Sequence, residues 1–115
     1  MAEIQLTKDA DALICVLYKE YLEKRKSGAP KRSANFFGSS KTIHANLMQK
    51  WPFEDVDDTI RELSRADLLN CLFADNIAYE VSISETGVIY MENRFKDGLA
   101  SLFSYIEKIR SLIPL

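Results

Sequence analysis

The sequence predicts a mainly α-helical domain with a small β-hairpin, an α+β fold, and three observations point to it. Four segments place apolar side chains at the three- and four-residue steps of one helix face. Two β-rich runs with alternating apolar residues flank the dipeptide Asp75-Asn76. A stretch rich in Gly, Ser and Pro, residues 27–40, separates the first two helical segments. The 115 residues suit one domain spanning 1–115.

The composition excludes several classes of protein. An apolar fraction of 47% and a charged fraction of 28% are those of a globular protein. No apolar run approaches the roughly 18 residues of a membrane span, and the N-terminus lacks a signal-peptide pattern, so we expect a cytoplasmic protein. Cys15 and Cys71 have apolar neighbours and predict buried thiols. Without a CxxC pair and with one histidine, we expect no metal and no cofactor.

The first helix is predicted over 8–27. Thr7 precedes it as a cap, and the apolar residues that follow define one face. Residues 27–40 then read mostly as a loop, because glycine, proline and serine are dense there. Phe36 and Phe37 lie in this loop, so we expect it to fold back and bury both rings.

Two further helices are predicted over 40–50 and 54–66. The first ends before Pro52, which lacks a backbone donor and biases the preceding residue away from helical angles. The second ends at Asp67, a residue type that tolerates left-handed angles. A hairpin over 69–83 follows, with Asp75-Asn76 in a primed turn that requires positive φ.

A long helix is predicted over 85–113, with Ser84 as its cap and a bend at Gly98. Its apolar stripe steps by three and four residues, close to the spacing of a coiled-coil seam. The stripe either packs on the first helix of the same chain or pairs with a second chain. We favour a homodimer, and the predicted interface consists of Phe95, Leu99, Leu102, Phe103, Ile106, Ile109 and Ile113.

Two short patterns flank the hairpin. The first, Leu-x-x-x-Gly-Leu-hydrophobic, is matched by Leu63, Leu68 and Leu69, with Asp67 at the glycine position. The second, hydrophobic-Thr-x-x-Gly, is matched by Ile83, Ser84 and Gly87, with serine for threonine. With the order helix, helix, hairpin and helix, residues 8–95 resemble the winged helix-turn-helix superfamily, and in particular its small bacterial and phage-encoded regulators. The 85–113 helix would be a dimerisation extension.

This resemblance implies a DNA-binding transcriptional regulator. The helix 54–66 would be the recognition helix in the major groove, with Arg61 and Arg65 reading guanine edges. Residues 24–50 contain seven Lys or Arg and no acid, so they carry +7 within a net charge of −2. Such a segment suits the phosphates of double-stranded DNA. The candidate phosphate contacts are Lys31, Arg32, Ser39, Ser40, Lys41, Thr42 and Lys50.

Other features favour a different partner. Four acids crowd the start of the recognition helix; they suit the helix dipole but repel phosphates. The hairpin tip is short and holds an acid, Asp75. The alternative is therefore a non-catalytic protein-interaction module of phage or mobile-element type. A third hypothesis is a small-molecule sensor that uses the aromatic residues. No nucleophile motif or phosphate loop orders the polar residues, so we expect no enzyme activity.

Overall fold

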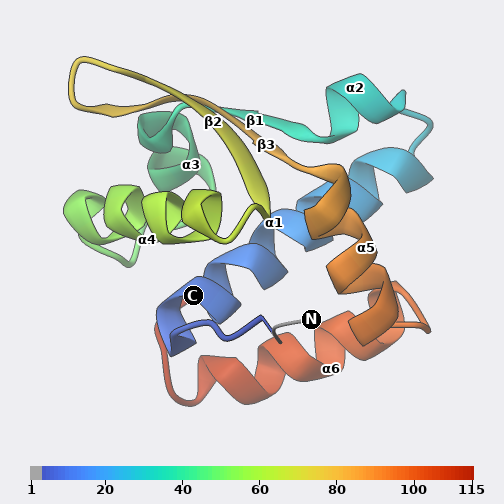
Figure 1. Cartoon of the computed structure of the whole chain (residues 1–115). Helices are drawn as coiled ribbons and strands as arrows, with labels where there is room; N and C mark the ends of the chain where they lie inside the picture. Colours follow the sequence, from blue (N-terminus) through green and yellow to red (C-terminus); the bar gives the residue numbers. More distant parts are fainter. Residues whose placement is uncertain (1–3) are drawn as a thin grey trace.

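The computed structural model describes residues 4–115, and the fold is mainly helical with a three-stranded antiparallel sheet (Figure 1). The prediction that the N-terminus carries no signal peptide falls partly on residues 1–3, outside the described range. In chain order the elements are α1 (Lys8–Lys26), α2 (Lys31–Ala34), β1 (Phe36–Gly38), α3 (Ser40–Asn46), α4 (Phe53–Arg65), β2 (Leu69–Ala74), β3 (Ile77–Ile83), α5 (Glu85–Arg94) and α6 (Leu99–Arg110). The strand order is β1-β3-β2. The predicted α+β class is confirmed.

Helix α1 is the centre of the molecule, with α4 and α6 packed against it (Figure 1). Thr7 caps it as predicted, because its Oγ1 accepts from the N–H of Ala10 at 3.2 Å. Most of its apolar side chains are buried, among them Leu13, Leu17 and Tyr18. A helix covered on several sides is apolar around most of its circumference. The observed bounds lie within one residue of the predicted ones.

The segment 27–40 is more ordered than predicted, because it forms α2 and β1 rather than a loop. The carbonyl of Asn35 accepts from the N–H of Ile83 at 2.9 Å, and Phe36 pairs with Ser82 in the sheet. Successive strand residues point to opposite faces. Phe37 is therefore buried, whereas Phe36 stays 45% exposed, and the prediction that both rings are buried is wrong for Phe36.

Helix α3 ends at Asn46, earlier than the predicted Lys50. The chain turns there so that Met48 and Trp51 enter the core ahead of Pro52. The Nε2 of His44 lies 2.8 Å from the carbonyl oxygen of Trp51 and closes this turn. Burying these two large side chains therefore stabilises the fold more than a further turn of α3 would.

The left-handed backbone predicted at the end of α4 and in the hairpin turn is confirmed at all three residues. Asp67 has φ 63° and ends α4, and the N–H of Leu68 reaches back to the carbonyl of Leu63 at 3.0 Å. In the hairpin turn, Asp75 and Asn76 have φ of 53° and 65°, the positive values that a primed turn requires.

Ser84 joins the end of α4 to the start of α5. Its hydroxyl donates to the carbonyl of Asp67 at 2.6 Å and accepts from the N–H of Gly87 at 2.9 Å. A Cβ on Gly87 would lie 2.3 Å from the carbonyl oxygen of Leu68. The Ser-x-x-Gly pattern therefore encodes a cap and a close backbone crossing, which explains both residues without a ligand.

The predicted continuous helix over 85–113 is wrong, because the chain breaks into α5 and α6 between Phe95 and Gly98. Gly98 has φ 67°, a value outside the right-handed helical region, so the expected bend is a complete break. The break lets α6 fold back along α1 (Figure 1).

The apolar stripe of the C-terminal segment, which includes α6, packs on its own chain. Phe95, Leu102, Ile106 and Ile109 are buried in the core. At most 8% of each residue is exposed, so they offer little surface to a second chain, and the structure assigns them to the core instead of a dimer interface. Of the other predicted interface residues, Leu99 and Ile113 are half-buried and Phe103 is 42% exposed.

Candidate functional site

Arg61, predicted to read a base, is instead tied to the hairpin. Its Nε donates to Asp57 Oδ2 at 3.0 Å, and its Nη2 donates to the carbonyl of Asn76 at 2.7 Å. The guanidinium also lies 4.7 Å from the centre of the Phe73 ring. These contacts place the side chain between α4 and the hairpin turn and direct two of its N–H donors into the fold.

Asp57 holds this arrangement from the buried side of α4. Its Oδ1 accepts from the N–H of Ala78 at 3.0 Å. Burial alone raises the pKa of Asp57, but the Ala78 hydrogen bond and the adjacent Arg61 outweigh it, so the pKa lies below its ordinary value. We call Asp57, Arg61, Phe73, Asn76 and Ala78 the hairpin latch.

The exposed surface of α4 is acidic. Glu54, Asp55 and Asp58 are exposed, and Arg65 is the exposed basic residue near the end of the helix. A hollow of about 320 Å³ lies between α4 and the start of α1. Its lining consists of Thr7, Asp9, Asp55, Asp58, Thr59, Glu62 and Arg65. Glu62 is already engaged, since it accepts from the N–H and the hydroxyl of Thr7 at 3.1 and 2.8 Å.

The charged side chains predicted to contact phosphates remain exposed, and the two on α2 lie apart from that surface (Figure 1). Lys31 and Arg32 are on α2, Lys41 is at the start of α3, and Lys50 precedes α4. Figure 1 shows α2 and α4 at opposite ends of the molecule. The structure therefore brings neither Lys31 nor Arg32 next to Arg65.

The three predicted hydroxyl contacts differ in their exposure. Thr42 is exposed, and Ser39 caps α3 by accepting from the Thr42 N–H at 3.2 Å. Ser40 is fully buried, and its hydroxyl donates to the carbonyl of Ala78 at 3.3 Å. Ser40 is thereby removed from the solvent-facing surface, because it holds α3 against β3.

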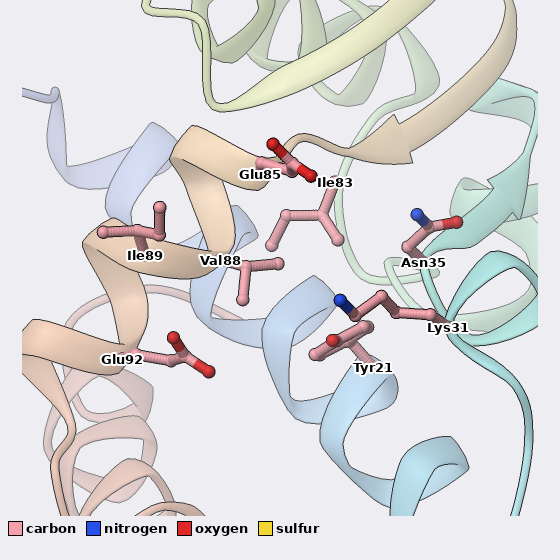
Figure 2. A pocket seen from close by; sticks show the side chains of 8 residues that line it. All are labelled: Tyr21, Lys31, Asn35, Ile83, Glu85, Val88, Ile89 and Glu92. Atoms are coloured by element: carbon pink, nitrogen blue, oxygen red, sulfur yellow. The ribbon is translucent and has the colours of Figure 1, made fainter.

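A groove of about 350 Å³ opens between α1, α2 and α5 (Figure 2). In Figure 2 the ammonium of Lys31 extends beside Tyr21, and Glu85 and Glu92 lie on the α5 side. The remaining lining residues are Asn35, Ile83, Val88 and Ile89. Two carboxylates thus face the same groove as Lys31, which weakens the positive potential around it.

Asp11 on α1 connects this helix to α5 and α6. The two terminal guanidinium nitrogens of Arg94, Nη1 and Nη2, and the hydroxyl of Tyr105 donate to its carboxylate, the Arg94 Nη2 to Oδ2 at 3.2 Å. Desolvation opposes the charge of Arg94, yet the contact with Asp11 keeps its pKa above the ordinary value. These three hydrogen bonds connect α1, α5 and α6 within the fold, so the cluster has a structural role.

The two cysteines differ. Cys15 is fully buried as predicted, and burial with the nearby Asp11 charge raises its pKa to about 12. Cys71 on β2 is only half-buried, and burial also raises its pKa. Within residues 4–115, no group of three or more His, Cys, Asp or Glu side chains is placed to hold a metal.

The exposed apolar surface of the hairpin was not predicted. Leu72, Phe73 and Tyr79 are 62%, 47% and 58% exposed. A bulge places Tyr79 as the extra residue of β3 between the pairs Leu72–Glu80 and Phe73–Ala78. The alternation of apolar residues marked the strands but gave no indication that the hairpin extends beyond the core.

Across the described chain, no helix has both the length and the hydropathy needed to cross a membrane. Comparison with models of protein families, with curated proteins and with solved structures gives no match to this chain.

Proposed function

We propose that this protein is a non-catalytic protein-interaction module built on a winged-helix fold. The order α3, α4, hairpin and α5 supports the winged-helix arrangement, in which α4 corresponds to the recognition helix. The caps at Asp67 and Ser84 occupy the positions of the two family patterns. The hairpin latch supports it further, because it fixes the wing against α4.

The acidic surface of α4 is the observation that favours a protein partner over DNA. Glu54 and Asp55 lie in the first turn of α4, the end that approaches phosphates in helix-turn-helix complexes. Duplex DNA carries one negative charge per roughly 1.7 Å of its axis. Exposed carboxylates at this end repel such a partner, and the engaged Arg61 offers little compensation. A protein surface rich in Lys and Arg is electrostatically complementary to it.

Charge reversal on the two sides of the molecule tests this proposal. A Lys/Arg-rich peptide titrated into ¹⁵N-labelled protein should shift the amide signals of α4 and of the start of α1. The variant Asp55→Lys/Asp58→Lys should abolish these shifts. The matched control Lys31→Glu/Arg32→Glu, on α2, should preserve them. Shifts confined to other elements, or a response unaffected by Asp55→Lys/Asp58→Lys, would refute the proposal.

A DNA-binding transcriptional regulator is the second candidate, and the acid-free basic segment favours it. Lys31, Arg32, Lys41 and Lys50 are exposed, and none forms a salt bridge within residues 4–115. In this case the α2–α3 side, rather than α4, would contact the phosphates.

Fluorescence anisotropy with a labelled mixed-sequence duplex over a salt series separates the two candidates. Phosphate contact gives a log–log slope of several units, and each lost contact lowers the slope by about 1. Under the DNA hypothesis, Lys31→Ala/Arg32→Ala/Lys41→Ala should therefore reduce the slope by about 3. Under the protein-interaction proposal, binding should stay at or below the weak level of non-specific association.

A further inference from the structure

The groove between α1, α2 and α5 contains a buried tyrosine whose hydroxyl group has no partner in the fold. Tyr21 is 6% exposed and lines this groove. The hydroxyl of Tyr105 is hydrogen-bonded within residues 4–115, whereas that of Tyr21 is not. No buried polar side-chain atom of these residues lacks a partner, so the Tyr21 hydroxyl reaches the open groove. Because buried polar side chains are normally hydrogen-bonded, this hydroxyl is available to a ligand in the groove.

Two further hydrogen-bond donors lie on the same wall of the groove. The ammonium of Lys31 extends beside Tyr21, and the side-chain amide of Asn35 lies on the same side (Figure 2). Lys31 forms no salt bridge within the described residues. An ammonium, a hydroxyl and an amide together offer several N–H and O–H donors, whereas an ionised carboxylate only accepts. This wall is therefore complementary to a carboxylate.

The opposite wall, on α5, carries two carboxylates. Glu85 and Glu92 are seven residues apart, about two helical turns, so they lie on one face of α5. Both are exposed, and neither forms a salt bridge within the described part of the chain. Carboxylates in this position attract an ammonium or a guanidinium group. Between the two walls lie Val88, which is half-buried, and Ile83, which is 2% exposed; we call these two residues the apolar floor (Figure 2).

We propose that this groove binds a carboxylate and an ammonium group at the two ends of an aliphatic chain, as in the C-terminal lysine of a peptide. The α-carboxylate accepts hydrogen bonds from Lys31 and Tyr21. The side-chain ammonium donates to Glu85 and Glu92, and the methylene groups between the two ends pack on the apolar floor. Each charged end meets a group that is complementary to it, so the ligand as a whole matches the groove electrostatically.

The separation of the charges on two walls favours a C-terminal lysine over other small ligands. A free apolar amino acid holds both charges on one carbon, and a fatty acid brings no cation to α5. The stem of a lysine packs against apolar surface while its charged end remains at a polar site. The groove volume of about 350 Å³ lies near the lower end of the roughly 300–1,000 Å³ of small-molecule sites, which suits one terminal residue.

The groove is separate from the acidic surface of α4. It is formed by α1, α2 and α5, and Figure 1 shows α4 and α5 on opposite sides of the molecule. This inference therefore does not depend on the proposed function, since a failure of peptide binding at α4 would leave the groove unchanged.

Three small probes test the groove in titrations of ¹⁵N-labelled protein. 6-Aminohexanoate carries both charged ends, hexanoate only the carboxylate, and hexylamine only the ammonium. 6-Aminohexanoate should shift the amide signals of α2 and α5 and bind about tenfold more tightly than either analogue, because each end adds a charge-assisted hydrogen bond. Equal affinities for the three probes, or shifts confined to other elements, would overturn the proposal.

Variants separate the two ends of the site. Lys31→Met should weaken the binding of 6-aminohexanoate about tenfold without weakening that of hexylamine. Glu85→Gln/Glu92→Gln should weaken the binding of 6-aminohexanoate without weakening that of hexanoate. The matched controls Arg32→Met and Asp97→Asn, at exposed residues outside the groove, should bind all three probes like wild type. A groove variant that weakens the three probes alike would contradict a site with two charged ends.

Peptides distinguish a C-terminal lysine from a free ligand. A peptide that ends in lysine should shift the same amide signals as 6-aminohexanoate, and its C-terminal amide should bind about tenfold more weakly because the carboxylate is lost. Tyr21→Phe, which keeps the ring and removes the hydroxyl, should reduce the difference in affinity between the two peptides. Binding of 6-aminohexanoate without binding of the peptide, or equal binding of the acid and the amide, would overturn the assignment to a C-terminal lysine.

Discussion

At the scale of single residues, polar side chains that look functional in the sequence turn out to connect elements. Asp57 accepts from Arg61 on the same helix and from the backbone N–H of Ala78, and so links α4 to β3. Ser84 links α4 to α5 in the same way. Buried polar groups of this kind are costly when a partner is lost, since the remaining group stays desolvated.

The lowered pKa of Asp57 predicts a pH-dependent contribution to stability. Because the folded-state pKa lies below the unfolded value of about 3.9, the stabilisation is complete above that value and disappears as the pH falls through the folded-state pKa. Asp57→Asn should lower the free energy of unfolding at neutral pH by about 1.5–3 kcal/mol. Urea denaturation should show this difference shrinking below about pH 4. The exposed control Asp58→Asn should show little change, and a pH-independent difference would contradict the interpretation.

Gly87→Ala should destabilise the protein although alanine favours helices. Replacing glycine within a helix ordinarily gains up to about 1 kcal/mol. Here the added Cβ would lie 2.3 Å from the Leu68 carbonyl oxygen, and overpacking of this kind costs about 1–3 kcal/mol or more. Thermal denaturation should show a lower midpoint for Gly87→Ala than for the neighbouring exposed control Thr86→Ala. A stabilised Gly87→Ala would show that α5 can move away from Leu68.

At the scale of elements, the C-terminal helices show how one apolar stripe can serve two structures. Its spacing suits a seam between chains, but the break at Gly98 returns α6 to α1 of the same chain. Intramolecular packing needs no second molecule, so the buried residues of the stripe pack into the core of their own chain. Phe103 remains outside, where Lys19 lies 5.6 Å from its ring centre.

Substitutions along α6 should therefore change stability rather than assembly. Leu102→Ala should cost about 2–5 kcal/mol, because the removed side chain is fully buried. Phe103→Ala, on the exposed side, should cost less than about 1 kcal/mol. Denaturant titration measures both values. Leu102→Asp would separate two chains if the stripe formed a dimer interface, but we expect it to unfold the protein. A folded monomer from this variant would instead support the dimer interface.

At the scale of the whole molecule, the C-terminal segment contacts the middle of the chain. The indole Nε1 of Trp51 donates to the carbonyl of Pro114 at 2.6 Å, across 63 residues. The same scale decides the charge distribution: the acids of α4 and the bases of α2 lie at opposite ends (Figure 1). The surface is therefore polarised in space as well as along the chain.

Truncation of the C-terminal segment should be visible in fluorescence, because Trp51 is the one tryptophan in the sequence. Removing Pro114 and Leu115 takes away the acceptor of a buried donor, which costs about 1–3 kcal/mol. The emission of Trp51 should move to longer wavelength as water reaches the indole. Leu112→Ala, at a residue 74% exposed on the same segment, should leave the emission unchanged. Identical spectra for the truncated and full chains would place the indole N–H elsewhere.

Residue types and their spacing were enough to predict the local features of this protein. Thr7, Asp67, Asp75-Asn76 and Ser84 act on neighbouring backbone, so their caps and turns could be predicted from residue type and spacing. The sequence also located the basic segment. Tertiary structure decided the rest: β1 exists because β3 supplies its partner, and Arg61 turns from a candidate base reader into a latch because the hairpin returns to it. Contacts between residues far apart in the chain leave no periodic pattern in the sequence, and these contacts settle which surfaces remain available to a partner.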